Sequence, residues 1–146
     1  MNGEIEFMVD DVLSFHEDMA SLFAMEKGVR DFGLLESAVS APFQSFGGVE
    51  LYPTVTEKAA RLCYGLAKNH PFFDGNKRTA LHTMLVYLAV HGLALPVDDE
   101  ELEGMIIDVA CGKMDLQGLS RWLDERVTYD FGGTEATGNE AVAWRM

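Results

Sequence analysis

Six residue types that can do chemistry fall within nine consecutive positions of the sequence, in the stretch HPFFDGNKR at residues 70–78. The stretch supplies a possible base (His70), a possible metal ligand (Asp74) and two cations (Lys77 and Arg78). A nearly uninterrupted apolar run follows from Thr79 onward. The sequence thus places reactive groups at the start of a helix that it predicts to be buried.

Gly75 and Asn76 lie where the predicted loop becomes this buried helix. The first N–H groups of a helix have no partner within the helix and carry its positive dipole end, so such a start can bind an anion. Lys77 and Arg78 would oppose the dipole in the first turn unless an anion is present. The pattern therefore predicts a phosphate site at this helix start.

Asp74 beside a phosphate site could hold Mg²⁺, which prefers one or two carboxylates together with phosphate oxygens. An imidazole at position 70 could take a proton from an attacking hydroxyl. Each residue alone has an ordinary interpretation: a histidine at a helix end stabilises the dipole, Asp-Gly forms a turn, and Lys and Arg are solvated. Their combination at one buried helix start favours the functional interpretation.

The elements that must position these residues are mainly helical. Helices are predicted within 9–25, with Asp10 or Asp11 as the cap; from Asp31 to before Pro42; from the capping box of Thr54 and Glu57 to about Asn69; and at 76–91 with Gly92 beyond its end. Two more follow in 98–113 and 115–127. Gly47 and Gly48 predict a short hairpin in FQSFGGVELYP. We expect a mainly α domain at 1–127, with about six helices around a buried central helix, and a flexible tail at 128–146.

Composition sets limits on function. The 146 residues are 48% hydrophobic with a formal net charge of −13, which argues against direct nucleic-acid binding because phosphate neutralisation needs a basic surface. Cys63 and Cys111 both lie in apolar helical patterns and are predicted to be buried free thiols. No signal peptide is predicted at the start, and no run reaches the roughly 18 apolar residues of a membrane span, so we expect a cytoplasmic protein without a membrane partner.

The stretch HPFFDGNKR resembles the signature of the Fic/Doc (Fido) superfamily, His-Pro-Phe-x-Asp/Glu-Gly-Asn-x-Arg, at each defined position. The residues around it, from about 10 to 126, resemble the death-on-curing (Doc) branch. The resemblance implies a Fido fold with a flap hairpin near the motif and transfer of part of ATP to a protein hydroxyl. It implies that His70 is the base, that Asp74 binds Mg²⁺, and that Gly75, Asn76, Lys77 and Arg78 hold the phosphates, Arg78 having a catalytic role as well.

Two positions favour one branch of this superfamily. Members that transfer AMP have a second Gly after the Asn and a further Arg three residues after the motif Arg, whereas this chain has Lys77 and Leu81 there. The Asn-Lys-Arg form is similar to the Doc branch, which implies a toxin kinase that moves the terminal phosphoryl of ATP to a Thr or Ser of a translation protein such as elongation factor Tu. It also implies an antitoxin that folds into a groove. An AMP or other NMP transferase and a catalytically silent, antitoxin-binding Fido domain remain alternatives.

Overall fold

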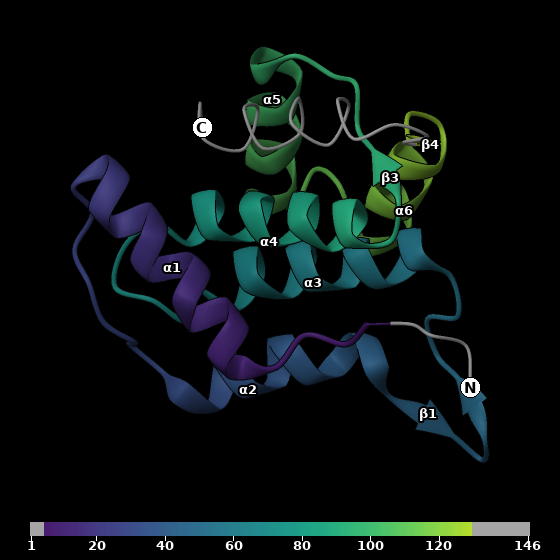
Figure 1. The fold of residues 1–146 in the computed structure, drawn as a ribbon, viewed down its shortest axis with the longest axis horizontal. Helices are drawn as coiled ribbons and strands as arrows, with labels where there is room; N and C mark the ends of the chain where they lie inside the picture. Colours follow the sequence, from purple (N-terminus) through teal and green to yellow (C-terminus); the bar gives the residue numbers. More distant parts are fainter. Residues whose placement is uncertain (1–4, 130–146) are drawn as a thin grey trace.

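The computed structural model describes residues 5–129 and is mainly helical, which confirms the predicted class (Figure 1). Its elements are α1 (Val9–Phe23), α2 (Phe32–Ser40), the 3-10 helix η1 (Ala41–Phe43), β1 (Ser45–Phe46), β2 (Val49–Glu50), α3 (Val55–Asn69), α4 (Asn76–Val90), β3 (Leu93–Ala94), α5 (Asp99–Ala110), α6 (Leu116–Asp124) and β4 (Thr128–Tyr129). The six α-helices of this described part agree with the number expected from the sequence.

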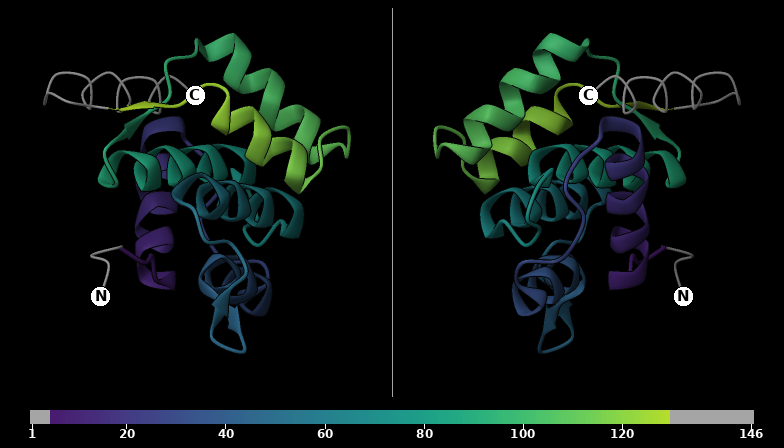
Figure 2. Two further views of the ribbon diagram at one scale, coloured as in Figure 1. Left: turned by 90° about the vertical axis from the view of Figure 1, so that its right-hand side faces the viewer. Right: turned by 90° about the vertical axis from the view of Figure 1, so that its left-hand side faces the viewer.

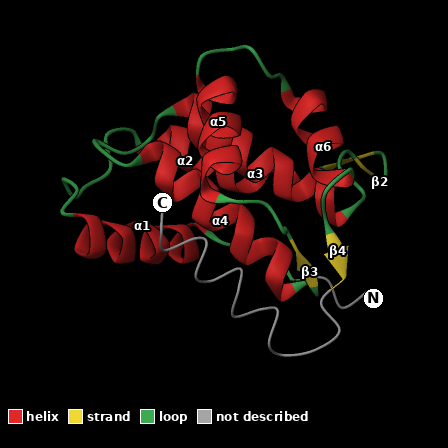
Figure 3. Ribbon diagram, turned by 90° about the horizontal axis from the view of Figure 1, so that it is seen from above, coloured by secondary structure: helices red, strands yellow, loops and turns green. Residues whose placement is uncertain are grey.

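Helices α3 and α4 form the centre of the molecule. They run in opposite directions side by side, with α5 and α6 on one side and α2 and the β1–β2 hairpin on the other (Figures 1 and 2). Helix α1 lies across α4, and the view from above shows α5 and α6 over the central pair (Figure 3). The loop between α3 and α4 therefore joins the two central helices of the fold.

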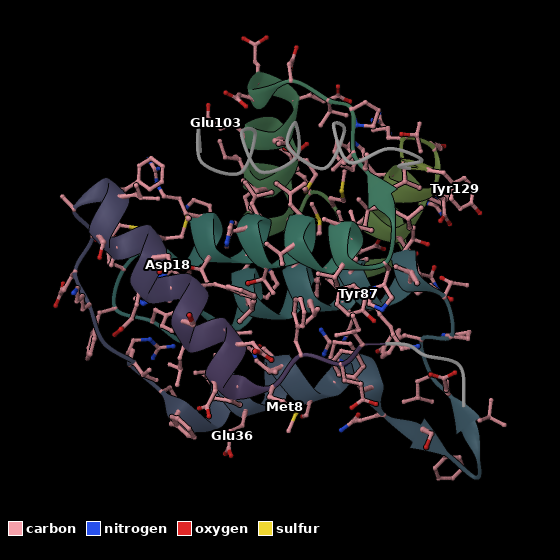
Figure 4. All side chains as sticks on the ribbon, in the orientation of Figure 1. Met8, Asp18, Glu36, Tyr87, Glu103 and Tyr129 are labelled. Carbon is pink, nitrogen blue, oxygen red and sulfur yellow. The ribbon has the colours of Figure 1, made fainter. Side chains whose placement is uncertain are left out.

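Helix α4 is buried around almost its whole circumference, as the apolar run predicts. Tyr87, labelled in Figure 4, is fully buried on α4 and is surrounded by the rings of Phe7, Phe43 and His91. This helix is nevertheless only 15 residues long. Among residues 5–129, no helix combines the length and the apolar character needed to cross a lipid bilayer.

Local capping explains where four of the helices begin. The side chains of Asp31, Thr54, Asp98 and Asp115 each accept a hydrogen bond from a backbone N–H of the first turn. The prediction for α1 was wrong: Met8 is its N-cap, and the Asp11 carboxylate accepts a hydrogen bond from the Met8 N–H at 2.8 Å. Asp11 therefore stabilises the start of α1 from within the first turn.

The two small sheets have different origins in the sequence. The predicted hairpin is confirmed as β1 paired with β2, and the turn residues Gly47 and Gly48 both have positive φ. The sequence did not predict the second sheet, in which β3 pairs with β4. Residues 128 and 129, assigned from the sequence to the tail, therefore belong to the folded part, and the rest of the predicted tail, 130–146, lies outside the described residues.

The two cysteines have different environments. Cys63 is a buried free thiol on α3, as predicted. Cys111 is also a free thiol, but it is exposed, so the prediction of burial was wrong for this residue. Cys111 follows the last residue of α5, where the apolar pattern of that helix has ended.

Candidate active site

The loop of residues 70–75 connects the end of α3 to the start of α4, and the backbone at its first and last residues is left-handed. His70, the residue after α3, has the left-handed φ of 53°, and Gly75, the N-cap of α4, has a φ of 74°. Gly75 adopts this conformation without the steric cost that a Cβ would add. The two turns reverse the chain between two buried helices.

Asn76 closes this loop from inside. Its side chain is buried, accepts a hydrogen bond from the Phe72 N–H at 2.9 Å and donates one to the Phe72 carbonyl at 3.0 Å. Phe72 is itself fully buried. The Asn76 side chain is thus used within the protein, so the part of Asn76 that an anion could contact is its backbone N–H.

The start of α4 lacks the side-chain cap found at α2, α3, α5 and α6. Gly75 has no side chain to accept hydrogen bonds from the first turn, and no other residue within 5–129 caps it through a side chain. The first turn also contains no acidic residue, whereas it contains Lys77 and Arg78. A helix start without such compensation is suited to bind an external anion, and the phosphate site at this helix start stays a prediction.

Arg78 is held in place at this start but lacks a full set of hydrogen bonds. Its guanidinium carbon lies 3.9 Å from the centre of the Phe23 ring at the end of α1. Its Nη1 atom is buried and has no hydrogen-bond partner among the described residues. A buried guanidinium N–H without a partner costs free energy, and a phosphate oxygen is the acceptor that its planar geometry suits. Lys77, in contrast, is exposed.

Asp74 is exposed beside the start of α4, and one of its carboxylate oxygens, Oδ2, accepts a hydrogen bond from the Glu26 N–H at 3.0 Å. No group of three or more His, Cys, Asp or Glu side chains in the described part of the chain could hold a metal ion alone. Mg²⁺ fits such a place through one carboxylate and the phosphate oxygens of a nucleotide. The donor set thus suits a metal that arrives with its nucleotide.

His70 is exposed at the start of the same loop, while its backbone is fixed. Arg30 donates hydrogen bonds from Nε to the His70 carbonyl at 2.8 Å and from Nη2 to the Asn69 carbonyl at 3.1 Å. The Asn69 side chain donates to the Leu34 carbonyl at 3.0 Å. Arg30 thus caps the C-terminal end of α3, and within residues 5–129 the His70 imidazole makes no hydrogen bond that would occupy it.

The segment of residues 24–31 lies along the 70–75 loop and covers part of it. The Phe73 N–H donates to the Gly28 carbonyl, and the Arg30 N–H donates to the Pro71 carbonyl at 2.7 Å. The side chain of Met25 is so close to Gly75 that a Cβ built on Gly75 would lie 2.2 Å from the Met25 methyl carbon. Met25 therefore covers Gly75 at the start of α4 in this conformation, and an anion that approaches Gly75 from this side would displace this flexible side chain.

The structure brings together all six residues that the sequence selected, because they share one loop and one helical turn. It adds His16, Met25, Glu26 and Arg30, which contact the loop, and Phe23, which contacts Arg78; all five come from α1 and the segment after it. Nothing in the sequence indicated a role at this site for Phe23 or Met25, because apolar residues at a helix end are common. Only the buried face of α1, which includes His16, indicated that this helix meets the core.

The β1–β2 hairpin does not lie near the 70–75 loop, contrary to what the resemblance implied. It contacts the N-terminal end of α3, where the buried Lys58 bonds to Glu50 at 2.8 Å and to the Tyr52 carbonyl. The loop follows the other end of this 15-residue helix, about 22 Å away at 1.5 Å per residue. Figure 1 shows β1 and the α3–α4 connection at opposite ends of the molecule.

Comparisons with known proteins point to one family. The sequence model of the Fic/DOC family matches residues 6–88, which include the 70–75 loop. A Mycolicibacterium smegmatis protein named Toxin Doc is 40% identical over 100 residues, which cover 67% of this chain and 77% of that protein. An Escherichia phage P1 protein named Protein kinase doc is 26% identical over 111 residues, which cover 76% of this chain and 86% of that protein.

Proposed function

Because the chain belongs to the Fic/DOC family, we propose that it is a Doc-like toxin that transfers the terminal phosphoryl group of ATP to a Thr or Ser hydroxyl of a translation protein. The names Toxin Doc and Protein kinase doc of two relatives support this reaction. A translation protein as the target implies that the toxin acts in the cytoplasm. The resemblance of HPFFDGNKR to the Doc branch suggests a target like elongation factor Tu. The same relatives support an antitoxin as the partner that keeps the toxin inactive.

The observation that carries the proposal is the Arg78 Nη1 atom, which is buried without a partner beside a helix start that has no side-chain cap. Phe23 holds the guanidinium in this position before any ligand is bound. A triphosphate supplies the acceptor oxygens that both Arg78 and the first N–H groups of α4 lack. Phosphoryl transfer depends mainly on such positioning and charge neutralisation.

The residues of this chain divide the chemistry between them. His70 accepts the proton of the target hydroxyl as its oxygen bonds to the terminal phosphorus of ATP, and the bond from that phosphorus to the β–γ bridging oxygen breaks to release ADP. Arg78, Lys77 and the N–H groups of Gly75 and Asn76 neutralise the phosphate charge. Mg²⁺, held by Asp74 and phosphate oxygens, would supply further charge neutralisation.

Two side chains favour phosphoryl transfer over AMP transfer. Leu81 stands where AMP-transferring members have an Arg, and it is 1% exposed in the core, so it cannot contact a phosphate. Lys77 stands where those members have a Gly, so its side chain adds charge and bulk at the first turn of α4. Both changes remove features that an AMP-transferring site uses.

The test is to incubate the protein with a cell extract that contains the target and with ATP labelled at either the α or the γ phosphate. Label from γ-phosphate alone on a protein supports the kinase, and label from α-phosphate alone would show an AMP or NMP transferase. The His70→Ala variant should lose the labelling while it still binds ADP, and the exposed Arg121→Ala variant on α6 is the matched control. No labelling, together with equal toxicity of the parent and His70→Ala proteins in cells, would favour a silent antitoxin-binding domain.

A further inference from the structure

His16, on α1, reaches the 70–75 loop although it lies outside the motif. Its imidazole is 3% exposed, and its ring is stacked on that of Phe72 with 3.8 Å between centroids and 5° between planes. The His16 Nε2 atom lies 2.9 Å from the backbone carbonyl oxygen of Asp74. Because a carbonyl oxygen can only accept, Nε2 carries the proton and donates this hydrogen bond.

This hydrogen bond fixes the orientation of one particular peptide unit. The peptide between Asp74 and Gly75 is planar and trans, so its N–H points away from the side to which its C=O points. With the carbonyl held by His16, the Gly75 N–H is directed away from α1. That N–H precedes the first turn of α4, where the anion is expected to bind.

The packing of His16 against Phe72 does not by itself require a hydrogen-bond donor at position 16. Phe72 is already fully buried and tied by two hydrogen bonds to the Asn76 side chain, so an apolar ring at position 16 would fill the space. The Asp74–Gly75 peptide, in contrast, precedes a glycine with positive φ, and the freedom of glycine allows such a peptide to rotate. A donor placed on its carbonyl restrains that rotation.

We infer that His16 is a positioning residue that holds the Asp74–Gly75 peptide so that the Gly75 N–H faces the phosphate and the Asp74 carboxylate stays beside it. This inference rests on the proposed function, because it assigns His16 a purpose at the same nucleotide site. The residue acts through the peptide and does not contact the nucleotide. Its chemical requirement is a hydrogen-bond donor at the position of Nε2.

Two substitutions separate the hydrogen bond from the packing. His16→Gln keeps an N–H donor at a similar distance along the side chain, and His16→Phe keeps an aromatic ring on Phe72 but has no donor. Glu17→Gln, at the exposed neighbouring position, is the matched control. The measurements are ADP affinity without Mg²⁺ by calorimetry, the melting temperature, and ¹⁵N relaxation dispersion of the Gly75 amide in the free protein.

We expect His16→Phe to bind ADP about three- to tenfold more weakly, the effect of one lost hydrogen bond, and to show millisecond exchange at Gly75. His16→Gln should keep parental affinity and a quiet Gly75 amide, and all variants should melt close to the parent. Parental ADP affinity and a quiet Gly75 amide in His16→Phe, or equal losses in both variants, would overturn the inference.

The outcomes also separate this inference from the proposed function. If the parent protein binds ADP and His16→Phe binds it equally well, the role of His16 is wrong and the proposed function stands. If the parent protein binds no ADP but Gly75 shows exchange only in His16→Phe, the proposed function is wrong, whereas the restraint of the peptide by His16 stands.

Discussion

Arg78 has the most unusual environment of the side chains at the α3–α4 connection. Its guanidinium is stacked on Phe23, and its Nη1 atom is buried without an acceptor. A side chain fixed in this way loses little freedom when an anion binds, which favours binding. At the scale of single residues, the proposed phosphate binding therefore depends on the charge and the planar geometry of Arg78.

Replacement of Arg78 by alanine should lower the rate of phosphoryl transfer by about 100-fold or more, as expected for loss of one preorganised charge-stabilising group. Arg78→Lys should recover only part of this rate, because an ammonium lacks the planar guanidinium that stacks on Phe23. Initial rates with γ-labelled ATP measure both effects. A rate for Arg78→Ala within twofold of the parent would mean that Arg78 does not contact the reacting phosphate.

The two thiols should differ in reactivity. Burial raises the pKa of Cys63 to about 12, so at pH 8 almost none of it is the reactive thiolate, whereas Cys111 is exposed. An aromatic disulfide reagent should react with one thiol of the native protein and with both after denaturation. Cys111→Ser should abolish the native reaction, and a fast reaction that remains in that variant would show that α3 opens readily.

At the scale of elements, the segment of residues 24–31 decides whether the start of α4 is accessible. Met25 covers Gly75, and the Glu26 N–H occupies one oxygen of Asp74. Both contacts are made by one short connection after α1. Because the Met25 side chain is unbranched and flexible, it can move at small cost when a nucleotide enters.

Met25→Ala should therefore bind ATP more tightly, with a KM about two- to fivefold lower, because no partly buried side chain has to leave the site. The kcat should stay close to the parental value. Met8→Ala is a matched control, since Met8 is exposed at the other end of α1 (Figure 4). A higher KM for Met25→Ala would show that Met25 contacts the bound nucleotide and does not merely cover an empty site.

The buried His82 on α4 predicts that the stability of the protein depends on pH. Burial lowers the pKa of His82 below its ordinary value of 6.5, and Asp18 opposes this shift to a smaller extent. Below that value the unfolded chain takes up a proton that the folded protein does not, so the free energy of unfolding falls as the pH falls.

The leucine of the His82→Leu variant cannot take up a proton. The free energy of unfolding of this variant should therefore change less with pH than that of the parent, by at most about 1.4 kcal/mol per pH unit. Urea unfolding at about pH 7.5 and about pH 5.5, compared between the parent and His82→Leu, measures the difference, since a change of slope with pH reports the protons bound. Equal pH dependence in the parent and His82→Leu would assign the effect to other groups.

The elements show which features a sequence can predict. The capping box of Thr54 and Glu57 and the glycine turn of the hairpin are local, so the pattern of a few residues was sufficient. The β3–β4 pair was missed because each strand has two residues and the partners are far apart in the chain. The contact of His16 with Asp74 joins positions 58 residues apart, and only the folded chain reveals it.

At the scale of the whole molecule, the fold separates two ends that the sequence alone could not place. The α3–α4 connection lies at one end with the candidate phosphate-binding residues, and the β1–β2 hairpin lies at the other. Lys77 and Arg78 are two neighbouring cations on a protein whose formal net charge is −13. This net charge favours the prediction that the protein does not bind nucleic acid, whereas two local cations are compatible with one nucleotide.

The most direct test of the proposed nucleotide site is a crystal structure of the protein with a non-hydrolysable ATP analogue and Mg²⁺. We expect phosphate density against the N–H groups of Gly75 and Asn76 and against Arg78 Nη1, with Met25 displaced and the His70 imidazole facing the terminal phosphate. Density for the analogue elsewhere, or a fully bound analogue with Met25 still over Gly75 and Arg78 Nη1 still without an acceptor, would contradict it.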